Sequence, residues 1–109
     1  MKRYCLTLDL KDDEQLIKEY EQYHVKIWPE IEESIKSSGI LNMQIYRQHT
    51  RMFMIIETQD NFSFNAKAAS DMANPKVQEW EDLMWKYQQA LPQAKAGEKW
   101  LLMDKIFEI

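Results

Sequence analysis

Apolar residues change their spacing along this 109-residue chain, from every second position to every third or fourth position and back again. Over residues 4–10 they alternate strictly, with Tyr4 and three leucines on one face and smaller or polar residues on the other. This pattern predicts a half-buried β-strand. The stripe that follows, from Leu16 to Ile35, has the period of an α-helix. The chain is therefore expected to fold as a mixture of strands and helices.

Pro29 interrupts the helical stripe. Proline lacks a backbone donor and disfavours a helical residue before it, so a break is predicted at Trp28 and a second helix is predicted to begin with Pro29. Asp12 precedes Gln15 by three residues, which predicts a capping box at the start of the first helix. Gly39 is typical of the residue that ends a helix.

Five further elements follow from the same signals. They are strands over residues 40–48 and 52–58 joined by a turn at 49–51, helices over 61–72 and from 74 to 91, and a final alternating strand over 99–109. The resulting order, β-α-β-β-α-β with the second α in two pieces, predicts an α+β fold of the ferredoxin-like type, formed by residues 1–109 as a single domain.

Such a fold has one antiparallel sheet with helices on one face, so the other face needs a cover. A second copy of the chain or the walls of a ligand cleft would provide one, and a homodimer is expected.

Charge and composition exclude several functional classes. The formal net charge is −4 and no stripe of Lys and Arg is present, which argues against binding to nucleic acid or to an anionic membrane. The single cysteine, Cys5, cannot form an internal disulfide. No apolar run is long enough to span a membrane, and Asp9 interrupts the first apolar stretch too early for a signal peptide. The expected location is the cytoplasm.

Metal and cofactor motifs are also missing from the sequence. The two histidines are far apart, and neither HExxH nor CxxC spacing occurs. Two glycines cannot form a phosphate-binding loop, and there is no GxSxG turn. The expectation is chemistry without a metal and without a cofactor.

Tyr20 and His24 are four residues apart on the predicted helix and therefore share a face. Trp28 follows four residues later. Histidine can donate and accept a proton near neutral pH, a phenol can form hydrogen bonds, and an indole offers a flat apolar wall. This combination suits a carbohydrate. A Tyr and a His in an apolar stripe are, however, more often core residues, and the pattern alone leaves both interpretations open.

Other candidates carry weaker signals. Asn42 is in phase with Gln44 and Tyr46, a polar row that either lines a cleft or faces water. Trp80 and Trp85 are five residues apart in a predicted helix, so at least one of them is expected in the core.

The run from Tyr20 to Glu30 resembles the Y-x-x-x-H-x-x-I-W-P-E signature of the L-rhamnose mutarotase family. Ser38-Gly39, Asn42 with Ile45-Tyr46, the strand at 52–54 and Trp80 extend the resemblance over essentially the whole chain. The resemblance implies a dimeric α/β barrel and an isomerase of the aldose 1-epimerase type. Such an enzyme interconverts the α and β anomers of L-rhamnose or a related 6-deoxy sugar and uses no cofactor.

The same resemblance implies roles for individual residues. His24 is similar to the family's general acid, and Tyr20 and Asn42 are similar to its substrate contacts. Trp80 resembles the first of two tandem tryptophans that wall the sugar site, and Glu81 occupies the position of the second. With Trp28 they form the expected substrate-binding set. Glu81 and other departures around the substrate leave the preferred sugar open.

Two other functions remain possible from the sequence. One is a cofactor-free oxygenase-like enzyme on the same fold, which should have an apolar pocket for an aromatic substrate. The other is a non-catalytic module that binds a ligand or mediates dimerisation. Asn42, Gln44 and Glu81 indicate a polar pocket and therefore favour a sugar.

Overall fold

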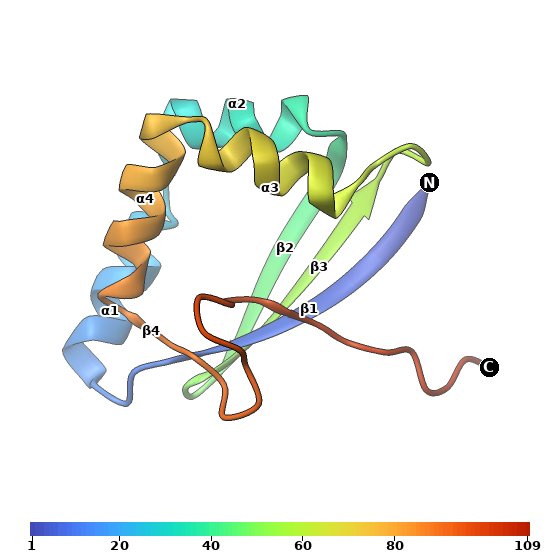
Figure 1. Cartoon of the computed structure of the whole chain (residues 1–109). Helices are drawn as coiled ribbons and strands as arrows, with labels where there is room; N and C mark the ends of the chain where they lie inside the picture. Colours follow the sequence, from blue (N-terminus) through green and yellow to red (C-terminus); the bar gives the residue numbers. More distant parts are fainter.

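The computed structural model describes residues 1–109 and places four helices on one side of an antiparallel sheet (Figure 1). In chain order the elements are β1 (Lys2–Leu10), α1 (Glu14–Tyr23), α2 (Pro29–Ser37), β2 (Ile40–Gln48), β3 (Arg51–Thr58), α3 (Phe64–Met72), α4 (Pro75–Trp85), β4 (Gln88–Gln89) and β5 (Leu101–Leu102). The strand order is β2-β3-β1-β4, and β5 also pairs with β1. The predicted α+β fold class and its βαββαβ order are confirmed.

The alternation in β1 sorts its side chains between the two faces of the sheet. Leu6, Leu8 and Leu10 are buried beneath the helices. Cys5 and Thr7, the residues on either side of Leu6, are only half-buried and lie on the opposite face. Strand β3 pairs with β1 along its length and alternates in the same way, so one apolar sheet face packs against the helix layer.

The ends of helices α1 and α2 are set by capping side chains, a proline and a glycine. Trp28 has an extended backbone, Pro29 opens α2, and Gly39 follows that helix with a φ of 97°, as the sequence predicted. The predicted capping residue of α1 is wrong by one position. Asp13, not Asp12, adopts the extended cap conformation, and its carboxylate accepts from the Leu16 backbone N–H at 3.0 Å.

The second half of the chain departs further from the prediction. Helix α3 begins at Phe64 rather than near residue 61, because the Ser63 side chain caps it. Helix α4 ends at Trp85, whereas the sequence predicted a helix to residue 91. The backbone of Gln88 and Gln89 instead pairs with Leu10 and Asp9 of β1. That pairing satisfies the exposed edge of β1, and local propensity gives no sign of it.

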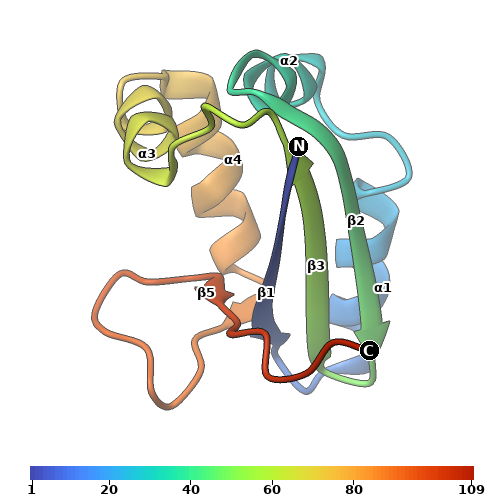
Figure 2. The same ribbon diagram turned by 90° about the vertical axis from the view of Figure 1, so that its right-hand side faces the viewer.

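The predicted final strand over 99–109 is reduced to two residues, Leu101 and Leu102. After them the Met103 N–H donates to the Cys5 carbonyl at 2.7 Å. The chain then leaves the sheet on its open side and extends away from the molecule (Figures 1 and 2). Apolar and polar residues alternate in this tail, but no other strand of the same chain lies beside it to pair with, so it does not form the predicted strand.

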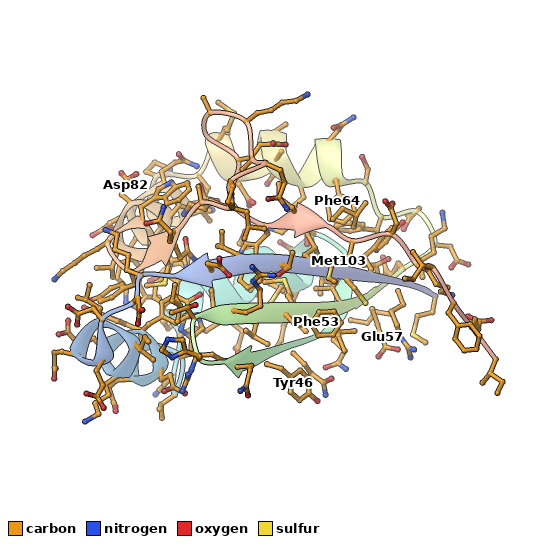
Figure 3. The ribbon with its side chains drawn as sticks, turned by 90° about the horizontal axis from the view of Figure 1, so that it is seen from below. Tyr46, Phe53, Glu57, Phe64, Asp82 and Met103 are labelled. Atoms are coloured by element: carbon orange, nitrogen blue, oxygen red, sulfur yellow. The ribbon has the colours of Figure 1, made fainter.

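No helix covers the second face of the sheet, which is called the open face below. Figure 3 shows it with Tyr46 of β2 and Phe53 and Glu57 of β3 labelled. Tyr46 lies opposite Phe53 in the register, and Phe53 lies opposite Thr7. The pairing of β2 with β3 shifts by one residue between Ile40 and Asn42, as in a β-bulge. None of the helices has the length and apolar character needed to cross a membrane.

Candidate active site

A cavity of about 370 Å³ lies between the inner sheet face and the helix layer. Of its 24 lining residues, 17 are hydrophobic. The sheet contributes Leu6, Met43, Ile45, Met54 and Ile56. The helices contribute the opposite wall, so the inward-facing residues of the strands and of the helices line a half-open cavity.

Polar groups gather where α1, α4 and β4 meet. Tyr20 and His24 come from α1 and its C-terminal cap, Glu81 comes from α4, and Gln88 comes from β4. Lys99 also lines the cavity, from the segment before β5. Tyr20, His24 and Gln88, which contact one another through Tyr20, are called the polar end of the cavity.

One ring nitrogen of His24 forms a hydrogen bond to the backbone, and the other has no hydrogen-bond partner within the protein. Its Nδ1 lies 2.8 Å from the Tyr20 carbonyl oxygen. Because a carbonyl can only accept, Nδ1 carries the proton and donates. Burial lowers the pKa of His24 below its ordinary value, and the backbone hydrogen bond offsets part of that effect. The imidazole is therefore neutral at pH 7, and its Nε2 presents a lone pair for proton transfer.

The Tyr20 ring packs against this imidazole, and its hydroxyl is bonded to Gln88. The two rings are 4.4 Å apart, and the Gln88 side-chain Nε2 donates to the Tyr20 oxygen at 3.2 Å. Burial raises the pKa of Tyr20 to about 12, although the hydrogen bond from Gln88 acts in the opposite direction. The phenol therefore stays protonated and can serve as a hydrogen-bond donor within the cavity.

Trp80 forms the aromatic wall next to His24. Its ring lies 5.7 Å from the His24 ring and 6.2 Å from the Tyr23 ring. Trp28 packs against the edge of Trp80 with ring centroids 5.0 Å apart. Trp80 lines the cavity, whereas Trp28 supports it without lining the cavity itself.

Glu81 and Lys99 place charge on the cavity lining, on the side where Gln78 links the Glu81 carboxylate to the Asp71 carbonyl. The Lys99 ammonium donates to the Glu81 backbone carbonyl at 2.8 Å and lies 4.8 Å from the centre of the Trp85 ring. Burial lowers the pKa of Lys99, and the carboxylates of Glu81 and Asp82 act against that shift. Trp85 does not line the cavity.

The other end of the cavity is more apolar. Phe62 and Phe64 pack edge to face at 5.0 Å. The only ion pair there joins Lys67 to Asp71 at 2.8 Å, and the Ser34 hydroxyl donates to Asp71 at 3.2 Å. No group of three or more His, Cys, Asp or Glu side chains is arranged to hold a metal ion.

The structure brings four of the six residues expected from the sequence to one place. Tyr20, His24, Trp80 and Glu81 all line the cavity. Asn42 lies on the open face instead, where its amide donates to the Glu57 carboxylate at 3.3 Å. That position is across the sheet from His24, so Asn42 does not join the cavity within one chain.

The sequence reasoning missed Gln88, Lys99 and Met43. Met43 lines the cavity because it follows Asn42 and therefore faces the other side of the strand. Its in-phase neighbour Ile45 was a usable signal. Gln88 lies where the sequence predicted a helix, and Lys99 lies at the start of the predicted final strand, of which only two residues form. Both residue types are common on protein surfaces, so neither indicates a site.

The fold and the cavity define a small α+β protein of the dimeric α/β-barrel fold class with a half-open site between sheet and helices. Solved structures share this fold. An L-rhamnose mutarotase from Formosa agariphila matches with a TM-score of 0.73 at 17% identity, covering 100% of this chain and 99% of the other. Tetracenomycin F2 cyclase from Streptomyces glaucescens matches with a TM-score of 0.63 at 15% identity, covering 100% of this chain and 97% of the other.

Sequence comparison is more specific than the fold. Residues 3–109 match the family model described as L-rhamnose mutarotase. The L-fucose mutarotase of Xanthomonas campestris pv. campestris is 40% identical over 111 residues, which cover 100% of this chain and 89% of the relative. The chain belongs to the L-rhamnose mutarotase family, and membership implies an isomerase-type enzyme that acts on a sugar.

Proposed function

We propose that this protein interconverts the α and β anomers of L-rhamnose, L-fucose or a related 6-deoxy sugar, with His24 as the proton-transfer group. The observation that carries the proposal is the arrangement at the polar end of the cavity. There the Nδ1 of His24 is bonded to the backbone, which leaves Nε2 available, and the protonated Tyr20 ring packs against the same imidazole.

Mutarotation requires only proton movement. In the proposed ring opening, His24 Nε2 takes the proton of the anomeric hydroxyl, the bond from C1 to the ring oxygen breaks, and the ring oxygen takes up a proton as the aldehyde forms. Both oxygens are attached to C1, so the imidazolium that forms can return its proton to the ring oxygen. Rotation about C1–C2 and the reverse steps give the other anomer.

This mechanism refines the sequence-based expectation that His24 is a proton donor. A lowered pKa makes the neutral imidazole the resting form, so His24 accepts first and donates afterwards. Tyr20 donates a hydrogen bond to the sugar, Trp80 packs against its apolar face, and Glu81 accepts from hydroxyls at the rim.

The test is exchange NMR on the anomeric protons of L-rhamnose and L-fucose, with D-glucose as a comparison sugar. Wild type should accelerate exchange of at least one 6-deoxy sugar, and His24→Ala should abolish the effect while keeping its circular dichroism spectrum. No acceleration of any sugar at micromolar enzyme would overturn the proposal.

One observation favours a second candidate, a cofactor-free enzyme acting on an aromatic substrate. Most of the cavity lining is hydrophobic, with Phe62 and Phe64 at the apolar end. Turnover of a polyphenol under oxygen, with no effect on sugars, would support this alternative.

We also propose that the protein is a homodimer whose copies meet across their open faces. Phe53 and Tyr46 present an apolar surface there, and Tyr46 is 56% exposed. The C-terminal tail supplies more apolar surface, since Phe107 is 78% exposed and has no strand partner in its own chain. Sedimentation velocity should give a dimer that Phe53→Asp dissociates. A monomer at all concentrations would contradict this arrangement.

A further inference from the structure

Gln88 lines the cavity and, like Tyr20, has only 4% of its surface exposed. Its Nε2 donates to the Tyr20 hydroxyl at 3.2 Å. Its Oε1 is buried and has no hydrogen-bond partner, and no other buried side-chain atom in the protein is left in that state. An unpaired acceptor in an apolar interior costs stability, which is why such atoms are rare.

The backbone fixes the position of this side chain. Gln88 lies opposite Leu10 in the short pairing of β4 with β1, and the preceding Tyr87 carbonyl accepts from the Lys11 N–H at 2.8 Å. Gln88 thus faces the helices and the cavity, whereas its neighbour Gln89 is exposed. A fixed strand position presents the amide at the polar end of the cavity beside Tyr20.

The hydrogen bond between Gln88 and Tyr20 also sets the direction of the Tyr20 proton. Because the Tyr20 oxygen accepts from Nε2, its own O–H is free to donate to another acceptor. The pair therefore offers one acceptor, Gln88 Oε1, and one donor, the Tyr20 hydroxyl. A sugar hydroxyl with a neighbouring oxygen has the complementary donor and acceptor.

We propose that Gln88 is a substrate-binding residue whose Oε1 accepts a hydrogen bond from one sugar hydroxyl, while its Nε2 directs the Tyr20 proton toward the same substrate. This inference rests on the proposed mutarotase function. It assigns a specificity-determining role, because a site built to pair with a hydroxyl discriminates against a sugar that lacks it.

The experiment measures KM and kcat for anomer exchange with wild type, Gln88→Met and the matched control Gln89→Met. The substrates are L-fucose, L-rhamnose and a series of their monodeoxy analogues. Gln88→Met should raise KM by roughly tenfold for the parent sugars, the order expected when one hydrogen bond is lost. For the analogue that lacks the paired hydroxyl, Gln88→Met should raise KM by clearly less than it does for the parent sugars, because only its effect on the Tyr20 proton remains. Gln89→Met should behave as wild type with every sugar.

A purely structural role would weaken every analogue equally, and that result, or an unchanged KM for all sugars, would overturn the inference. If wild type itself fails to accelerate exchange of any sugar, the proposed function fails first, so the two failures are distinguishable.

Gln88→Glu provides a second variant of almost the same shape. Once ionised, its carboxylate would accept a hydrogen bond from the Tyr20 hydroxyl, which then could not donate to the sugar. The activity of Gln88→Glu should therefore fall with rising pH over a range where the activity of wild type is constant. An activity as constant with pH as that of wild type would count against the proposal.

Discussion

The most direct test of the proposed chemistry is His24→Asn. An asparagine amide can replace the Nδ1–H that donates to the Tyr20 carbonyl, so the variant keeps the local hydrogen bond. It loses Nε2 and the contacts of the imidazole ring with Tyr20 and Trp80. We expect the free energy of unfolding at pH 7 to fall by about 1–2 kcal/mol, because the aromatic contacts of the ring are lost while the hydrogen bond is kept.

The catalytic effect should be much larger than the effect on stability. General acid–base groups contribute about 10²–10⁴-fold, so kcat for anomer exchange should fall by a factor in that range. The assay is exchange NMR, with thermal unfolding as the control for folding. A kcat within about threefold of wild type would refute the role given to Nε2, since the smallest acid–base contribution is larger.

The pH dependence gives an independent check. Burial lowers the pKa of His24, and the neutral form is the active one in the proposed mechanism. The wild-type kcat/KM should therefore be constant above about pH 6.5, the ordinary pKa of histidine, and should fall at lower pH once His24 protonates. Activity that instead rises as the pH falls below 6.5 would show that the protonated form is the working one.

The same shift affects stability. A histidine whose pKa is lowered by folding binds its proton more readily in the unfolded chain, so its contribution is complete above pH 6.5 and is lost as the pH falls toward the folded-state value. Three other substitutions test the structure. Asn42→Ala should leave KM for the sugar unchanged, because Asn42 bonds to Glu57 across the sheet from the cavity; a large rise in KM would place it in the site. Leu8→Ala should lower the free energy of unfolding in urea by ~2–5 kcal/mol, because Leu8 is fully buried. Gly39→Ala should cost ~1–3 kcal/mol in the same titration, because φ at Gly39 is 97°, and no loss would show that the strain is relieved.

Much of the fold was predictable from spacing alone. Strand β1, the break at Trp28, the start of α2 at Pro29 and the β2–β3 hairpin each follow from a local pattern. The C-terminal quarter was not predictable, because β4 and β5 form only where the β1 edge offers partners. Pairing between distant segments decides those strands, and propensity over a few residues does not report it.

The candidate site was likewise predictable where its residues are close in sequence and not where it depends on how distant segments pack. Tyr20 and His24 share a helix, so their proximity follows from a spacing of four. The polar row of Asn42, Gln44 and Tyr46 was correctly placed in phase, but the phase does not say which face of the sheet the helices cover. The apolar Met43 and Ile45 take the inner face, and burying them outweighs any preference of the polar row.

Three of the seven methionines line the cavity: Met43 on β2, Met54 on β3 and Met84 on α4. Unbranched thioether side chains change rotamer at little cost, in contrast to the branched isoleucines beside them. The cavity wall can therefore alter its contour without any movement of the backbone. Under the proposed function, sugars that differ in the orientation of a single hydroxyl would be accommodated by repacking of these side chains, with no change in the backbone.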